Sequence, residues 1–221
     1  MKILKEASTL QNYNMSLKLY ANSNILVIGA SQSGKTTSVL KIIEQKLIAP
    51  MPRKIFYLYA ARQPFMDEWK DRIEFVEGLD LTVIKDASED KLLIIDDLML
   101  SLNKDLAHHF IAGSSHKRTT TIFITHAIFL NNDLYRLISN NSQYMMLFYN
   151  KRNFSQVSRL ARQVLGSESD LLLEAYKKLD AYEFVLLSFH QRVPKELLIV
   201  TDFFEKCPSV YLRSSKPITV P

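Results

Sequence analysis

The chain has 221 residues, of which 47% are hydrophobic, and this length and composition suffice for one domain with a buried core. Its apolar runs are far shorter than the ~18 residues that a membrane-spanning helix needs, and residues 1–18 lack the apolar centre of a secretory signal. Cys207 is the single cysteine, so the chain cannot form an internal disulfide. We therefore expect a soluble intracellular protein without a membrane partner.

The net charge of +5 is unevenly distributed along the sequence. Residues 1–100 hold 13 basic and 13 acidic side chains, whereas residues 101–221 hold 15 basic and 10 acidic ones. The excess is concentrated between His116 and Arg162, where seven basic residues stand against one acidic residue, Asp133. Such a surface attracts polyanions, nucleic acid among them, although a run of charge is more often an ordinary solvated face.

A glycine-containing segment near the start of the chain determines how the rest is interpreted. The apolar residues Ile25–Ile28 predict a short buried strand, and residues 29–36 have the G-x-x-x-x-G-K-[ST] spacing of a Walker A loop. Gly29 and Gly34 let backbone N–H groups approach a phosphate, and Lys35 brings a positive charge to the β- and γ-phosphates. The sequence therefore predicts an ATP site whose loop consists of Gly29, Ala30, Ser31, Gln32, Ser33, Gly34, Lys35, Thr36 and Thr37.

A helix is expected directly after this loop. Apolar residues recur at helical spacing from Thr37 to Ile48, and Pro50 and Pro52 then stop the pattern. The positive end of this helix would point at the bound phosphates, and the Thr36 hydroxyl can ligate Mg²⁺. The alternative is a chance match of the motif in a loop, which the preceding strand and the following helix argue against.

A second apolar strand, within Lys91–Asp97, ends in two carboxylates, which is the Walker B pattern. Asp96 at the carboxyl end of this strand would hold Mg²⁺, and Asp97 would polarise the attacking water. The alternative is a strand that ends in a solvated acidic turn.

The remaining elements follow from hydrophobic periodicity and turn residues. Further strands are expected at Lys54–Tyr59, Thr119–Thr125 and Tyr144–Tyr149, with weaker candidates at Ile73–Val76 and Leu81–Ile84. Helices are expected at Gln63–Asp71, Leu102–Ala112, Asn153–Leu165 and Leu171–Leu179, and a closing hairpin at Tyr182–Phe189 and Leu197–Val200. This order predicts an α/β fold in a single domain, with an N-terminal arm at 1–21 and an extended tail at 208–221.

Two groups of polar residues lie near the ends of these elements. Thr125 and His126 close the strand at 119–125, where they could sense the γ-phosphate or cap the next turn. His108 and His109 suggest a metal site, but no cysteine is near, so we interpret them as histidines on a helix surface.

The order of these parts resembles the genome-packaging ATPases of double-stranded DNA viruses and virus-like transposons, within the FtsK/HerA superfamily. The Walker elements are generic, whereas Ser139–Tyr144 and Asn150–Val157 followed by Leu160–Gln163 are similar to the poxvirus-type, Polinton (Maverick) and adintovirus packaging proteins. The resemblance spans roughly residues 22–166. It implies a RecA-like, mostly parallel sheet flanked by helices, a homo-oligomeric ring, and ATP-driven movement of duplex DNA into a capsid. A capsid or portal protein would be the partner, in the host cytoplasm or nucleus or in the virion.

Residue by residue, the resemblance implies a metal ligand at Asp96, a catalytic acid at Asp97, and a polar sensor at Thr125 and His126. Two positions depart from the family pattern. His126 stands where many relatives have glutamine, and Asp97 stands where much of the wider superfamily has glutamate.

Further basic residues fit such a motor. An arginine from a neighbouring subunit could neutralise charge on the transferring phosphoryl group, and our candidates are Arg118 first and Arg152 second. Either arginine could instead contact DNA phosphate or be an ordinary surface charge. Lys151, Arg159 and Arg162 would hold the DNA backbone without reading its sequence.

Other functions share parts of this pattern. A P-loop kinase for a nucleotide or small molecule has a Walker A loop but does not need Asp97. A non-hydrolysing module that uses ATP as an assembly switch needs neither Asp96 nor Asp97. A helicase or a conjugation-type DNA pump is the nearest other motor, and the sequence lacks an added domain for strand separation.

Overall fold

The computed structural model describes residues 4–5, 17–113 and 116–211. Its centre is a ten-stranded sheet in the order β1-β12-β11-β10-β9-β3-β8-β7-β5-β6. Neighbouring strands run parallel through β9 (Tyr144–Phe148), β3 (Asn24–Ile28), β8 (Thr119–Thr125), β7 (Lys91–Asp96), β5 (Lys54–Tyr59) and β6 (Glu74–Glu77). The sheet continues with antiparallel pairs through β10 (Phe184–Ser188), β11 (Ile199–Thr201), β12 (Ser209–Tyr211) and β1 (Leu4–Lys5).

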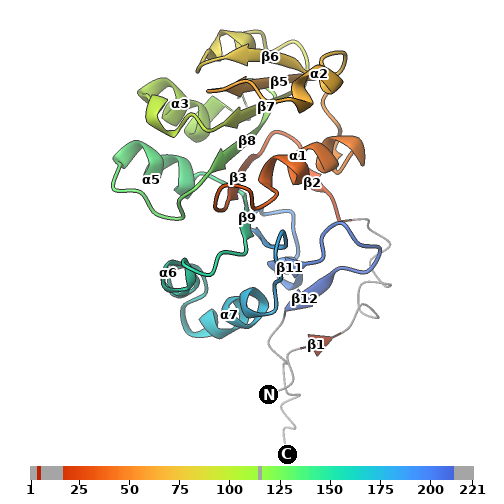
Figure 1. Ribbon diagram of the computed structural model, residues 1–221. Helices are drawn as coiled ribbons and strands as arrows, with labels where there is room; N and C mark the ends of the chain where they lie inside the picture. The colour runs from red at the N-terminus through yellow and green to blue at the C-terminus, as the bar shows by residue number, and fades with distance from the viewer. Residues whose placement is uncertain (1–3, 6–16, 114–115, 212–221) are drawn as a thin grey trace, which may run out of the picture.

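Helices cover both faces of the sheet (Figure 1). One face carries α1 (Lys35–Glu44) and α2 (Phe65–Trp69). The other carries α3 (Lys104–His108), α5 (Asp133–Asn140), α6 (Phe154–Leu165) and α7 (Ser169–Lys177). Short 3₁₀ turns lie at Leu81–Ile84, Met99–Ser101, Gly166–Glu168 and Lys195–Leu197, and a π-helical turn at His109–Gly113.

The central strands are apolar throughout because both of their faces are buried. In β3, Leu26 and Ile28 pack into the layer beneath α3, α5, α6 and α7, while Ile25 and Val27 pack beneath α1. The arrangement is a mostly parallel α/β sheet of the RecA-like type, as the sequence predicted, with the predicted parallel strands among its central members.

The helix after the Walker A loop ends earlier than predicted. It stops at Glu44, and Lys46 takes the left-handed conformation with φ 52°. The N–H of Leu47 then donates to the Ile42 carbonyl and that of Lys46 to the Ile43 carbonyl, which is the Schellman pattern that closes a helix. The freed residues Ile48–Ala49 form β4, which pairs with β2 (Leu19–Tyr20).

Two other expectations about local structure were wrong. Leu81–Ile84 is a 3₁₀ turn and not a strand, because the Asp80 carboxylate accepts a hydrogen bond from the Thr82 N–H and caps it. The sequence interpretation also missed α5. Its signals were present, since Asn132 caps the first turn through the N–H groups of Leu134 and Tyr135.

The two ends of the chain meet at one edge of the sheet. β1 pairs antiparallel with β12, so the described part of the predicted tail is extended. Most of the predicted N-terminal arm and residues 212–221 lie outside the described residues. Within the described part, no helix combines the length and apolarity that crossing a membrane requires.

Candidate nucleotide site

The carboxyl ends of adjacent parallel strands bring the Walker motifs together. Ile28, the last residue of β3, pairs with Thr125 of β8, and Asp96 of β7 pairs with Ile124. The loop after Ile28, the carboxylates after Ile95 and the polar residues after Ile124 therefore share one edge of the sheet. Ligands of open α/β sheets bind at this kind of edge.

The glycines of the Walker A loop are required by its geometry. Gly34 precedes α1 with φ 90°, a conformation that L side chains rarely adopt. A Cβ atom on Gly29 would lie 2.5 Å from Ser33 Oγ and 2.7 Å from Phe148 Cβ, both too close for a methyl group. The backbone of this loop can therefore fold tightly only with glycine at these positions.

Lys35 is buried at the centre of the loop with 6% of its surface exposed. Its ammonium group donates to the carbonyl oxygens of Gly29 at 2.9 Å and Ala30 at 2.7 Å. Burial lowers the pKa of Lys35, while the nearby carboxylates of Asp96 and Asp97 act to raise it. The lysine is thus held inside the loop and lies within the electrostatic field of the Walker B pair.

The Asp96 carboxylate is also buried, and two side chains hold it in place. The Tyr57 hydroxyl donates to Asp96 Oδ2 at 2.5 Å, and Gln63 Nε2 donates to the same oxygen at 3.2 Å. Burial together with the Asp96 charge raises the pKa of the Tyr57 phenol, while the nearby Thr36 side chain acts to lower it. Tyr57 therefore fixes one predicted metal ligand, Asp96, and lies close to the other, Thr36.

Sequence reasoning missed Tyr57 and Gln63. Neither belongs to a motif, and in the sequence Tyr57 is only one of several β-preferring residues of its strand. The pairing of Tyr59 with Asp96 in adjacent parallel strands is what brings this part of β5 to the site.

Asp97 and His126 face each other at the edge of the sheet. His126 Nε2 lies 3.3 Å from Asp97 Oδ1, and its Nδ1 lies 3.1 Å from the Gly29 carbonyl oxygen. The same Nδ1 is 3.4 Å from the ammonium group of Lys35. Asp97 takes the left-handed φ of 56° and keeps 64% of its side chain exposed.

Thr125 is placed differently from His126. Its side chain is fully buried, and its hydroxyl donates to Met99 Sδ at 2.8 Å. The Ala127 N–H also donates to the Thr125 hydroxyl, at 3.4 Å. These contacts match the capping interpretation of Thr125, whereas His126 contacts the phosphate loop itself.

The oxygen atoms at Asp96 and Thr36 suit a hard divalent cation. Over the described residues, no group of three or more His, Cys, Asp or Glu side chains could hold a metal ion by itself. A cation here would complete its shell with phosphate oxygens and water, which is the usual manner of Mg²⁺. The residues present therefore fit this cation.

The adjacent histidines do not both lie on a helix surface, contrary to the prediction. His108 is exposed, but His109 has 1% of its surface exposed, and its Nε2 lies 2.7 Å from Thr121 Oγ1. The π-helical turn that begins at His109 turns this side chain toward β8.

The two arginine-finger candidates lie at opposite ends of the parallel strands of the sheet. Arg118 stands at the amino end of β8 and makes a bidentate ion pair with Asp90, both N–O distances being 3.0 Å. Arg152 lies in the loop between β9 and α6, beyond the carboxyl end of β9, with its side chain exposed. Arg152 therefore shares the edge of the Walker loops.

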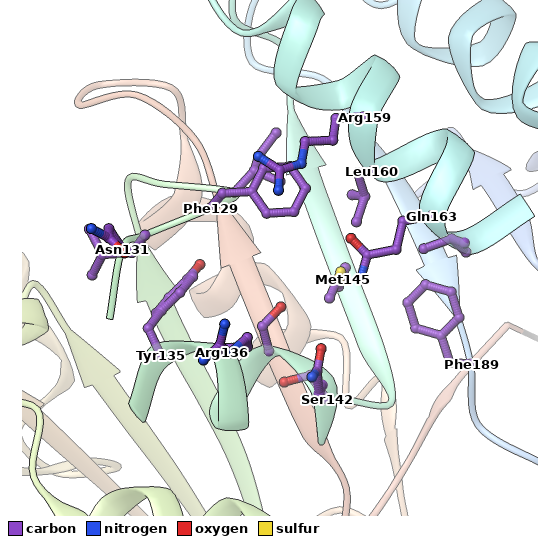
Figure 2. Close-up of a pocket in the computed structure, with 15 residues that line it drawn as sticks. Phe129, Asn131, Tyr135, Arg136, Ser142, Met145, Arg159, Leu160, Gln163 and Phe189 are labelled. Atoms are coloured by element: carbon purple, nitrogen blue, oxygen red, sulfur yellow. The ribbon is translucent and has the colours of Figure 1, made fainter. Parts of the chain in front are cut away.

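A second concave surface lies between α5 and α6 on the face away from α1 (Figure 2). This α5–α6 groove encloses about 800 Å³ and has no carboxylate among its lining residues. The Arg159 guanidinium lies 4.8 Å from the centre of the Phe129 ring, and Arg136 pairs with Asp133. Lys151, in the loop before α6, and Arg162, on α6, are also exposed, but neither lines the groove.

No protein-family model matches the chain, and no curated protein matches it. The solved structure of the DNA-packaging ATPase B204 from Sulfolobus Turreted Icosahedral Virus is similar. It has a TM-score of 0.55 at 12% identity, covering 78% of this chain and 95% of that chain. This chain has the fold of the P-loop NTPases.

Two structures of the genome packaging NTPase B204 from Sulfolobus turreted icosahedral virus 2 share this P-loop NTPase fold. The complex with AMPPCP has a TM-score of 0.54 at 12% identity, covering 78% of this chain and 95% of that chain. The complex with sulfate has a TM-score of 0.54 at 10% identity, covering 81% and 95%.

Proposed function

We propose that this protein is an ATPase that uses ATP hydrolysis to move double-stranded DNA into a viral capsid. One observation carries the enzymatic part: a buried lysine inside a glycine loop, a buried aspartate fixed by a tyrosine, and an exposed aspartate facing a histidine all lie at one edge of the sheet. The likeness in fold to a DNA-packaging ATPase and the basic surface around α6 support the packaging part.

The residues of the site have distinct tasks in this proposal. The loop from Gly29 to Thr37 surrounds the triphosphate with backbone N–H groups, and Lys35 neutralises charge on the β- and γ-phosphates. Asp96 and Thr36 would hold Mg²⁺, which when bound neutralises charge on the β- and γ-phosphate oxygens. Tyr57 keeps Asp96 in position, since its hydroxyl donates to Asp96 Oδ2.

Asp97 and His126 act on the water and on the product. The free oxygen of Asp97 accepts a hydrogen bond from the attacking water and so orients it toward the γ-phosphate. His126 contacts Asp97, Lys35 and the Gly29 carbonyl, so removal of the γ-phosphate changes the charge around its ring. His126 is therefore the sensor we propose, with Thr125 as the residue that caps the turn after it.

The sensor and the α5–α6 groove are joined by a short segment. Ala127–Asn131 runs directly from His126 to the groove, where Phe129 lies beneath the guanidinium of Arg159 (Figure 2). The Tyr135 hydroxyl of α5 donates to the Ala127 carbonyl and ties this segment to the helix. A shift at His126 is thereby transmitted to the arginine that we propose to contact DNA.

The protein would act as a ring in which an arginine from a neighbouring copy neutralises charge on the transferring phosphoryl group. Arg152 is the better candidate, since it is exposed and lies at the edge of the Walker loops. Arg118 would have to break its bidentate pair with Asp90. Mixing Arg152→Ala subunits with Asp97→Asn subunits tests this: partial recovery of hydrolysis in the mixture supports contribution in trans, and no recovery contradicts it.

The proposed function is tested by phosphate release from ATP, measured with and without duplex DNA and with candidate phosphoryl acceptors. Stimulation by DNA of any sequence is expected, together with loss of activity on chelation of Mg²⁺. Transfer of phosphate to a nucleotide or small molecule in place of water would identify a kinase instead. Binding of ATP without any turnover, with DNA present, would leave an ATP-dependent assembly module.

A further inference from the structure

A separate pocket of about 470 Å³ opens beside the Walker A loop, and the tasks assigned above do not use it. Gly34, Thr37 and Ser38 line one side of it, at the loop and the start of α1. The other side comes from the C-terminal strands and their connections, including Tyr182, Asp202 and Phe204. Its volume falls within the range of small-molecule sites.

The sheet order places this pocket at the end of the nucleotide opposite the metal ligands. β3, which leads into the Walker A loop, lies between β8 and β9. Asp96 is on the β8 side, so a γ-phosphate and its cation lie toward β7 and β8. The rest of a nucleotide held by the loop then extends toward β9, β10 and β11, where the pocket is.

Tyr182 is an exposed aromatic ring at this position, with 71% of its surface exposed. Its backbone takes the left-handed φ of 70°, which is uncommon for a bulky residue. Two of its side-chain carbons lie 3.6 Å from the place of a Cβ on Gly34, so the ring lies directly against the phosphate loop. Among the described residues, it makes no contact with another aromatic ring, whereas Phe204 across the pocket is covered by the ammonium group of Lys41 at 4.4 Å.

The charges in the pocket favour the nucleoside and disfavour phosphate. Three carboxylates, those of Glu183, Asp202 and Glu205, line the pocket against one basic residue, Lys41, and carboxylates only accept hydrogen bonds when ionised. They repel phosphates but can accept from the hydroxyl groups of a ribose and the amino group of a base. Asp202 is fixed by the Thr201 hydroxyl, which donates to its Oδ2 at 3.1 Å.

We infer that this pocket binds the purine base and ribose of the nucleoside triphosphate, with the base stacked on Tyr182 and the ribose hydroxyls bonded to the carboxylates. The inference rests on the proposed ATP site. We call it the nucleoside pocket. It gives the C-terminal strands a role in substrate affinity, while the Walker loop holds the phosphates.

The test compares the affinity of the whole chain for ATP with its affinity for tripolyphosphate, which has the same phosphate chain but no nucleoside. The variant is Tyr182→Asn, because asparagine tolerates the left-handed backbone. Loss of a stacked base is expected to raise the Kd for ATP by about 10-fold or more and to leave the Kd for tripolyphosphate unchanged. Tyr182→Phe should restore the affinity for ATP, and Phe154→Ala, an exposed aromatic on α6, serves as the matched control.

The preference among bases provides a second measurement. Wild-type protein should bind ATP more tightly than CTP, because a purine has the larger stacking face, and Tyr182→Asn should lose much of this difference. Equal loss of ATP and tripolyphosphate affinity in Tyr182→Asn, or no loss of either, would overturn the nucleoside pocket.

Failure of the proposed function would give a different result. If the wild-type protein binds ATP through Tyr182 but releases no phosphate with DNA present, the result supports the nucleoside pocket and contradicts the proposed motor function. Wild-type protein that binds tripolyphosphate as tightly as ATP would remove the nucleoside pocket and leave the phosphate loop.

Discussion

The nucleotide site and the α5–α6 groove differ in the burial and pairing of their charged side chains. At the nucleotide site, Lys35 and Asp96 are almost fully buried; Lys35 donates hydrogen bonds to two loop carbonyls, and Asp96 accepts one from Tyr57. On α6, Arg159 and Arg162 are exposed, and no carboxylate lines the neighbouring groove. The nucleotide site therefore holds its charged groups in place before a ligand binds, whereas the surface of α6 keeps its charged groups accessible to a partner.

The difference has a physical basis. Removing an ion from water costs several kcal/mol, so buried charges persist only where hydrogen bonds and opposite charges offset that cost. Such a site is rigid, as reaction on a phosphoryl group requires. Exposed cations cost little and release counterions when a polyanion binds, which suits the movement along DNA of any sequence that we propose.

The largest expected effect comes from removing the buried charge. Lys35→Ala should lower ATP hydrolysis by about 100-fold or more, since the phosphates lose their fixed positive charge. Phosphate release checks this, and Lys104→Ala, at an exposed lysine of α3, is the control. Hydrolysis at the wild-type rate in Lys35→Ala would place the active site elsewhere.

The next prediction tests whether Asp96 needs the hydrogen bond from Tyr57 to bind Mg²⁺. Tyr57→Phe should raise the Mg²⁺ concentration for half-maximal hydrolysis by about 10- to 100-fold, because the orientation of Asp96 is lost. The loss of one buried hydrogen bond should lower the free energy of unfolding by only about 1 kcal/mol. Tyr144→Phe, whose hydroxyl accepts from the Tyr20 N–H away from the site, is the control; an equal change in its Mg²⁺ requirement would show that the effect is not specific.

A smaller effect is expected from the exposed cations. Arg159→Ala with Arg162→Ala should reduce the salt dependence of DNA binding, with the slope of log K against log salt falling by about 2, and leave ATP hydrolysis without DNA unchanged. Arg136→Ala is the matched control in the same groove, because this arginine is already paired with Asp133. A slope that stays the same in the double variant would move the DNA surface away from α6.

The last prediction concerns stability, and it comes from a buried group that stays neutral. Burial, more than the charges of Lys117 and His108, lowers the pKa of His109 to about 4. The unfolded chain takes up this proton near pH 6.5, before the folded protein does, so stability is complete above pH 6.5 and falls as the pH drops toward 4. Denaturant unfolding should show a loss of at most about 3 kcal/mol over this interval, reduced in His109→Gln. An unchanged pH profile in His109→Gln would assign the loss to other groups.

The Walker A and Walker B parts of the site could be predicted from the sequence, because each is formed by residues that are close together in the chain. The Walker A spacing and the apolar run before Asp96 each describe a strand and the turn that follows it, so residues close in sequence carry the pattern. Tyr57 and Tyr182 carry no such pattern. Their importance comes from strand pairing and from a connection near the end of the chain, which bring them beside Asp96 and Gly34.

The sequence by itself determined the α/β class, the order of the main strands along the chain, and the positions of the Walker A and Walker B motifs, because periodicity and short motifs are properties of neighbouring residues. The tertiary structure decided which side chains complete the site and where the chain is charged but unpaired. It buried His109, directed Thr125 into the core, and paired Arg118 with Asp90 while leaving Arg152 exposed. These outcomes depend on contacts between residues that are far apart in the chain, and short sequence patterns do not predict such contacts.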